Sequence, residues 1–216
     1  MSQGIKKYTG FVLSVGNGAV GKTSLSRILD QHTLGGCSYS EIIGSIKKTK
    51  NLEFDFIPIK MAKNGTEYRV LVQLLVPPGQ KESEGDRSSR SFEDIIRIYD
   101  FYIQKFDVIL FMYRINDPIT FFDLDQWVEK VIRFCTPSTN FLLLGTHSDQ
   151  IRSRQISPDQ VEAGVAHFNQ KITKLLPNWR GFCHRLEISN LTGENLKELK
   201  MYLAYSIIHS QSGLSN

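Results

Sequence analysis

A glycine-rich segment between an apolar run and a helical pattern constrains this chain most. Gly16–Thr23 reads GNGAVGKT and directly follows the apolar run Phe11–Val15. Glycines let successive backbone N–H groups curl around an anion, and the following helix points its positive end at the same place. Lys22 can neutralise phosphate charge there, and the Thr23 hydroxyl can bind Mg²⁺. We therefore predict a nucleoside triphosphate site; the alternative is a tight strand-to-helix turn made for packing alone.

The composition is that of an ordinary globular domain. The chain has 216 residues, of which 41% are hydrophobic and 22% are charged. This length suits one α/β domain, which we expect over residues 1–210 with a short flexible tail at 211–216. A net charge of +4 is too small to indicate nucleic-acid binding, and no apolar run approaches membrane-spanning length.

Cysteines and the amino terminus indicate a cytoplasmic protein. Cys37, Cys135 and Cys183 are odd in number and lack CxxC spacing, so neither a disulfide framework nor a zinc site is predicted. No signal-peptide core follows Met1, and Ser2 stands where a myristoylated protein has glycine. We expect synthesis in a reducing compartment without a secretory leader or a myristoyl anchor.

Alternating apolar and amphipathic stretches predict an α/β fold. Six apolar runs are expected to be strands: Phe11–Val15, Phe54–Met61, Tyr68–Val76, Val108–Ile115, Phe141–Gly145 and Phe182–Ile188. Helical patterns separate most of them, which predicts a mostly parallel sheet with helices on both faces. The exception is Lys63–Thr66, where an Asn-Gly turn leaves no room for a crossover helix. That pair should be an antiparallel hairpin.

Capping residues mark where helices begin. Asp117 and Pro118 precede apolar residues at three- and four-residue spacing, which predicts an amphipathic helix through Val131. Ser157–Gln160 combines an N-cap serine, a first-turn proline and a glutamine that can bond back to the cap. Thr192–Asn195 opens a last helix, which we expect to close the fold.

Polar residues follow two strands at the edge where open α/β sheets bind ligands. Thr146, His147 and Asp149 come after one strand, and a carboxylate there can accept two hydrogen bonds from guanine that adenine cannot donate. Ser189–Gly193 follows another strand, and its backbone N–H groups can bond the guanine carbonyl. Alternatively, Asp149 is a plain loop carboxylate or helix cap, and Ser189 is a turn residue.

From Phe11 to about Ile208, the chain resembles the Ras-like small GTPases, most closely their Rab and Rho branches. Four stretches carry the resemblance in the family's order: Gly16–Ser24, Pro78–Gln80, Asn116–Phe121 and Thr146–Asp149. The resemblance implies a P-loop NTPase fold of six strands and five helices, which binds GTP or GDP with Mg²⁺. It also implies two switch loops that change shape with the third phosphate.

The resemblance also assigns roles to single residues. Lys22 would hold the β- and γ-phosphates, Thr23 would bind Mg²⁺, and Gln80 would orient the attacking water; Gln80 and Lys22 are the predicted catalytic residues. A solvated loop glutamine is the alternative for Gln80, and Gly18 leaves room for the water. Nucleotide contacts are implied for Gly18, Ala19, Val20, Gly21, Lys22, Thr23, Ser24, Gly79, Thr146, His147, Asp149, Ser189, Asn190 and Leu191.

Two departures from the family pattern concern Mg²⁺. Val76 stands where the family has an aspartate that holds the hydration shell of the ion, and valine cannot replace it. Ile42 stands where a threonine would touch Mg²⁺ and the γ-phosphate. Ser40 or Glu41 could substitute, although a solvent-facing loop role is the favoured interpretation for both.

The base-binding and second-switch stretches depart as well. Thr146 is also found in the Rho branch, His147 replaces a lysine, and Asn190 replaces an alanine of which only the backbone N–H is used. Guanine specificity therefore depends mainly on Asp149. The stretch 81–90 is longer and more polar than usual, which predicts mobility. Its arginines are expected to be solvated rather than to act as an internal arginine finger.

These observations favour a guanine-nucleotide switch that hydrolyses GTP slowly. The resemblance implies protein effectors, an exchange factor and a GTPase activator as partners, whereas no cysteine after Cys183 is present for a prenyl anchor. The alternative is a pseudo-GTPase, a binding module that holds one nucleotide without catalysis. An ATP-using P-loop kinase fits less well, because Asp149 would have no role in it.

Overall fold

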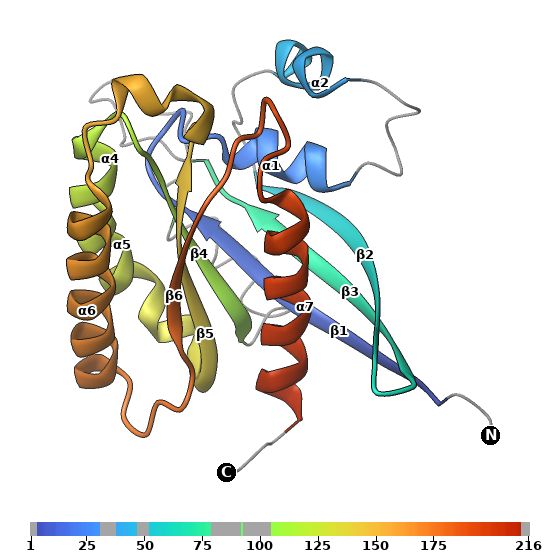
Figure 1. Ribbon diagram of the computed structural model, residues 1–216. Coiled ribbons are helices and arrows are strands. Elements are labelled where there is room, and N and C mark those ends of the chain that lie inside the picture. Colours follow the sequence, from blue (N-terminus) through green and yellow to red (C-terminus); the bar gives the residue numbers. More distant parts are fainter. Residues whose placement is uncertain (1–3, 31–37, 47–51, 79–91, 93–104, 213–216) are drawn as a thin grey trace.

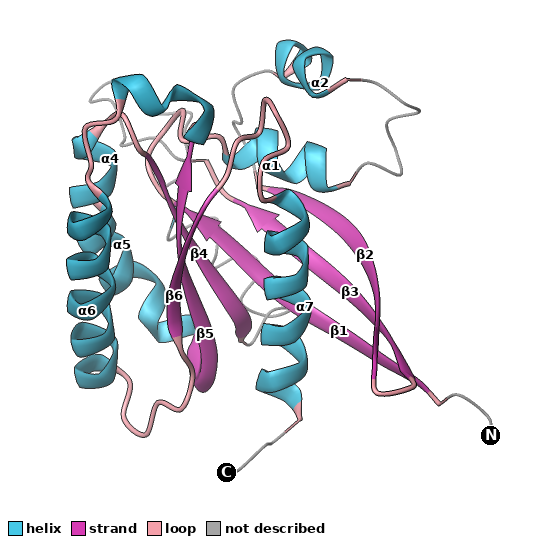
Figure 2. Cartoon of the chain, in the orientation of Figure 1, coloured by secondary structure: helices cyan, strands magenta, loops and turns pink. Residues whose placement is uncertain are grey.

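The computed structural model describes residues 4–30, 38–46, 52–78, 92 and 105–212. These residues form a six-stranded sheet in the order β2-β3-β1-β4-β5-β6 (Figures 1 and 2). Its strands are β1 (Ile5–Val15), β2 (Glu53–Lys63), β3 (Thr66–Val76), β4 (Phe106–Arg114), β5 (Cys135–Thr146) and β6 (Cys183–Glu187). Every neighbouring pair is parallel except β2 and β3. The predicted α/β fold with one antiparallel strand is confirmed.

Helices cover both faces of the sheet (Figure 1). The described helices are α1 (Lys22–Leu29), α2 (Tyr39–Ser45), α4 (Pro118–Phe122), α5 (Leu124–Val131), α6 (Pro158–Leu175) and α7 (Leu196–Gln211), with short 3₁₀ turns η2 (Ile132–Phe134) and η3 (Ser148–Ser153). α1 and α7 lie on one face, and α4, α5 and α6 lie on the other. Among the described residues, no helix combines the length and apolar character that a membrane crossing requires.

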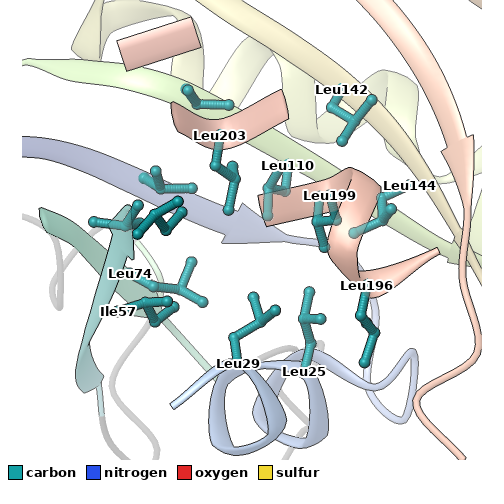
Figure 3. Close-up of a cluster of buried hydrophobic side chains, with 14 of the residues drawn as sticks. Leu25, Leu29, Ile57, Leu74, Leu110, Leu142, Leu144, Leu196, Leu199 and Leu203 are labelled. Carbon is teal, nitrogen blue, oxygen red and sulfur yellow. The ribbon is translucent and has the colours of Figure 1, made fainter. Parts of the chain in front are cut away.

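Successive side chains of the central strands point to opposite faces of the sheet and form two hydrophobic cores. Val12 and Leu110 face α1 and α7, whereas their neighbours Leu13 and Ile109 face α5 and α6. Figure 3 shows the first core, where leucines of α1, α7 and the sheet meet. With apolar side chains on both faces, the central strands are buried, as expected for a parallel sheet.

The hairpin and the helix caps form as the sequence predicts. Asn64 and Gly65 both have positive φ angles, 50° and 73°, which identifies a type I′ turn between β2 and β3. Ser157 Oγ accepts a hydrogen bond from the backbone N–H of Gln160, and the Gln160 side chain accepts one from the backbone N–H of Ser157. This capping box, with Pro158 in the first turn, begins α6.

Several predicted boundaries differ from the structure. β5 begins at Cys135 rather than Phe141. β1 begins at Ile5 rather than Phe11, because pairing with β3 continues through the polar residues that precede the apolar run. The helix expected through Val131 is split at Asp123, whose carbonyl accepts from the N–H of Gln126 only three residues ahead. Gln211, where we expected the tail to begin, ends α7, and its Nε2 donates to the Thr9 carbonyl at 2.7 Å.

Candidate nucleotide-binding site

Three loops meet at the carboxyl edge of the sheet, because β1, β5 and β6 all run in the same direction. Thr146 Oγ1 lies 3.0 Å from the carbonyl oxygen of Val20, which joins the end of β5 to the loop before α1. Asn190 Nδ2 donates to the Gly21 carbonyl at 3.1 Å, which joins the β6–α7 loop to the same place. The structure therefore brings the glycine-rich loop and the two predicted base-binding stretches together.

The glycine-rich loop has a backbone that requires glycine at two positions. Gly16 has φ 143°, and a Cβ added there would lie 2.2 Å from the Met112 carbonyl oxygen. Gly21 has φ 90° and is the N-cap of α1, so no side chain of the cap residue covers the first turn of that helix. The first N–H groups of a helix lack intrahelical partners and carry the positive end of its dipole. This arrangement suits an anion.

Lys22 places an ammonium group inside the loop. Its Nζ donates to the carbonyl oxygens of Gly16 at 2.8 Å and Asn17 at 2.7 Å, and the side chain is buried. Burial disfavours the charged form and lowers the pKa of Lys22 to about 7. A phosphate at the loop would favour the ammonium form again, so anion binding and protonation of Lys22 support each other.

Thr146 and His147 shape the base side of the site from within. The buried Thr146 hydroxyl also lies 3.0 Å from the Tyr113 carbonyl and 2.9 Å from His147 Nδ1, so it fastens β4, β5 and the glycine-rich loop. His147 has φ 64° and is half-buried. Burial and, to a smaller extent, Arg114 lower the pKa of His147, against an opposing effect of Asp149. The imidazole is therefore mostly neutral at pH 7.

Asp149 is exposed and is oriented by a buried serine. Ser189 Oγ donates to Asp149 Oδ1 at 2.5 Å and accepts from the backbone N–H groups of Leu191 and Thr192. The bond fixes one carboxylate oxygen. Asn190, also buried, donates to Gly21 through Nδ2, but its Oδ1 has no hydrogen-bond partner among the described residues.

The sequence interpretation missed two side chains at this edge. It used only the backbone N–H of Asn190, whereas the carboxamide bridges two loops. It also missed Tyr39 of α2, whose Cε2 lies 2.4 Å from where a Cβ on Gly193 would stand, so that α2 packs on the base-side loop. The signal in the sequence was the glycine at position 193, which adopts a positive φ of 81° in the structure.

The residues expected near Mg²⁺ fit that ion incompletely. Thr23 is the second residue of α1, directly after the glycine-rich loop, whereas Val76 and Ile42 are buried in the core that faces α1 and α7. Glu41 is committed to the cap of α2, where its carboxylate accepts from Ser38 N at 2.8 Å and Ser38 Oγ at 2.7 Å. These bonds lower the pKa of Glu41. Ser40 and Glu41 are exposed to solvent, as predicted, but they lie in helix α2 rather than in a loop.

Other predicted site residues cannot be placed. Gly79 and Gln80, the polar stretch 81–90 and Cys37 lie outside the described residues. In the part of the chain that the structure describes, no three His, Cys, Asp or Glu side chains form a group that could hold a metal ion. Of the oxygen donors that the resemblance implies for Mg²⁺, the Thr23 hydroxyl is the one these residues provide.

The carboxyl-terminal half of the chain is similar to a known protein family. The protein-family model of the Ras family matches residues 92–207. The match spans β4 to most of α7 and includes both base-side loops, whereas the glycine-rich loop precedes it. A search of curated proteins found none that matches the chain. Because the family model covers just over half of the 216 residues and the fold agrees, the chain belongs to the Ras family of GTP-binding switch proteins.

Proposed function

We propose that this protein is a guanine-nucleotide switch that binds GTP, hydrolyses it slowly to GDP and reports the change to protein partners. One observation carries the proposal. The hydrogen bonds from Thr146 to the Val20 carbonyl and from Asn190 to the Gly21 carbonyl bring the loop that contains Lys22 and the stretch that contains Asp149 to one edge of the sheet. An ammonium that binds phosphates and a carboxylate that selects a base are the two ends of a nucleotide site.

In this proposal, the loop from Gly18 to Ser24 binds the phosphates through its backbone N–H groups, and Lys22 neutralises the β- and γ-phosphates. Asp149 accepts hydrogen bonds from N1–H and the 2-amino group of guanine. The backbone N–H of Asn190 donates to the guanine carbonyl. Adenine has an amino group where guanine has that carbonyl and lacks the N1 proton, so it would leave both groups unpaired.

Hydrolysis is the in-line attack of water on the γ-phosphorus. A new oxygen–phosphorus bond forms while the bond to the β–γ bridging oxygen breaks, which releases GDP and inorganic phosphate. Lys22 stabilises the charge on the leaving phosphate oxygens, and Gln80 orients the water. Such reactions depend on positioning, so a GTPase activator that positions the reacting groups would accelerate slow hydrolysis. An exchange factor would accelerate slow release of GDP.

The alternative, a pseudo-GTPase that holds nucleotide without hydrolysis, is favoured by one observation. Val76 and Ile42 are buried apolar side chains at the two positions where the family has oxygen-bearing side chains around Mg²⁺. A protein with a weakened Mg²⁺ site would keep the base and phosphate contacts but lose control over the third phosphate.

Single-turnover hydrolysis separates these two functions. We expect wild-type protein loaded with GTP to convert it to GDP, and Gln80→Leu to slow this conversion at least about tenfold, because leucine cannot orient water. Gln126→Leu, a change of an exposed glutamine on α5, is the matched control and should keep the wild-type rate. Equal rates for wild type and Gln80→Leu would remove Gln80 from the mechanism, and no conversion by wild type would favour the pseudo-GTPase.

The Mg²⁺ site gives a second test. We expect chelation of Mg²⁺ to accelerate GDP release only weakly in wild type, because the valine at position 76 cannot hold the hydration shell. Val76→Asp should raise this chelator effect several-fold. The control is Val76→Asn, because asparagine is similar in size to aspartate but uncharged and reports the strain of a polar group in the core. Release rates from a fluorescent GDP analogue measure the effect, and equal chelator sensitivity in wild type and Val76→Asp would refute the prediction.

A further inference from the structure

The second residue of the glycine-rich loop is bonded at both ends of its side chain. Asn17 Nδ2 donates to Asp123 Oδ2 at 2.7 Å, and Asn17 Oδ1 accepts from Trp127 Nε1 at 3.4 Å. The backbone carbonyl of the same residue accepts from Lys22 Nζ at 2.7 Å. Asn17 therefore links two parts of the fold. Its side chain bonds the end of α4 and the first turn of α5, and its carbonyl bonds the ammonium group of Lys22.

The two partners of Asn17 come from adjoining helices, and Trp127 is held by its packing. Asp123 lies between α4 and α5, and Trp127 follows four residues later on the same side of the helix. The Trp127 indole is 8% exposed. Its ring makes a T-shaped contact with Phe92, with 5.3 Å between centroids and the planes at 89°, and Lys130 Nζ lies 5.0 Å from its centroid. The indole therefore has little freedom to leave Asn17.

The arrangement explains how a glycine-rich loop can keep a buried ammonium group in one place. Lys22 is directed by two backbone carbonyls, those of Gly16 and Asn17, so its position depends on how those peptide units are turned. The backbone of Gly16 packs closely on β4, since a Cβ added there would lie 2.2 Å from the Met112 carbonyl oxygen. Asn17 is held through its side chain: a charge-assisted bond to Asp123 and a bond from the Trp127 indole set the direction of its peptide unit.

We propose that Asn17, Asp123 and Trp127 form a latch, here the loop latch, that positions Lys22 for the outer phosphates of the nucleotide. The proposal rests on the proposed function and makes the three residues positioning residues, which act through Lys22. It predicts that disturbing the loop latch weakens the binding of a nucleotide with a β-phosphate and spares one without it.

The test compares GDP with GMP, which lacks the β-phosphate that Lys22 meets. In Asn17→Asp, two carboxylates face each other, and we expect GDP affinity to fall about tenfold or more while GMP affinity stays within about twofold. Adding Asp123→Asn restores one amide and one carboxylate with their places exchanged. In this double variant, the ratio of GDP to GMP affinity should return to within about threefold of wild type.

Asp123→Asn therefore has opposite effects in the two backgrounds. Alone it weakens the latch, because a charged acceptor is lost, and after Asn17→Asp it restores the latch. Trp127→Phe keeps a ring against Phe92 but removes the indole N–H, and should lower the ratio about threefold. The matched control is Asp125→Asn, since Asp125 accepts from Lys171 and His167 instead of the loop; it should leave the ratio unchanged.

Each outcome decides between specific claims. If wild type binds neither nucleotide, the proposed function and the loop latch both fail. If wild type prefers GDP but Asn17→Asp keeps that preference, or the exchanged pair does not restore it, the latch alone fails. Equal losses for GDP and GMP would mean that Asn17 only supports the fold, which also overturns the latch. Circular dichroism melting checks folding, and Asn17→Ala, which adds no charge, serves for the same ratio if Asn17→Asp does not fold.

Discussion

Lys22→Ala protein should bind GDP roughly a thousandfold more weakly than wild type, because it loses charge-assisted bonds to the phosphates and the neutralising ammonium group. Lys22 Nζ is the cation that the structure places within the glycine-rich loop, between the carbonyls of Gly16 and Asn17. The backbone N–H groups of the loop remain in the variant, so weak binding persists. Isothermal titration with GDP measures the loss.

The control for this prediction is Lys174→Ala, which removes an exposed lysine on α6 and the same formal charge. It should keep wild-type affinity, because it lies away from the loop. Melting of both variants separates loss of binding from loss of fold, since alanine at position 22 leaves two loop carbonyls without the lysine. GDP affinity that stays at the wild-type level in a folded Lys22→Ala protein would mean that the loop is only a strand-to-helix turn.

Asp149→Asn should turn the preference of the protein from guanine towards xanthine. Asparagine keeps one acceptor for N1–H but presents an N–H₂ group where the carboxylate accepted the 2-amino group of guanine. Xanthine has a carbonyl at that position and accepts this donor. We expect GDP to lose about a hundredfold in affinity and xanthosine diphosphate to become the tighter ligand, because two facing donors leave each other without an acceptor in the complex.

The hydrogen bond from Ser189 orients the side chain at position 149, on which this prediction depends. The Ser189 hydroxyl fixes Oδ1 of Asp149, so the substituted amide inherits a defined orientation. Asp159→Asn, a change of an exposed carboxylate in the first turn of α6, is the matched control and should leave the preference for GDP intact. Competition between the two diphosphates for a fluorescent nucleotide provides the readout. A folded Asp149→Asn protein that still prefers GDP would make Asp149 an ordinary loop carboxylate.

The features that could be predicted from the sequence are the ones that local chemistry determines. Asn64-Gly65 specifies a type I′ turn because both residues tolerate positive φ, and this turn makes β2 and β3 antiparallel. Ser157 and Gln160 satisfy each other's backbone across one helical turn. Buried runs alternating with amphipathic ones predicted the parallel part of the sheet.

The features that were missed depend on contacts between distant parts of the chain. β1 extends to Ile5 because β3 supplies hydrogen-bond partners, which hydrophobicity does not report. Asn17 and Asp123 are 106 residues apart, and neither stands out in its own segment. Ile42 is another residue whose role depends on tertiary contacts. The resemblance placed it in a switch loop, whereas its burial in the core holds α2 as a helix.

The candidate site was predicted in part for the same reason. A glycine-rich loop and the ends of parallel strands are recognisable from the sequence pattern, which predicts Lys22, Thr146, Asp149 and Ser189 as site residues, and the fold brings them to one edge. The bridge from Asn190 to Gly21 was not foreseen, because it needs a side chain to cross from one loop to another. The pattern gives the positions of functional groups, and tertiary packing gives their orientation.

The nucleotide that accompanies the purified wild-type protein tests the central claim most directly. Denaturing the protein and separating the released nucleotides by chromatography should give GDP or GTP at close to one molecule per chain. Adenine nucleotides in their place, or no nucleotide together with no binding of added GTP, would contradict the account.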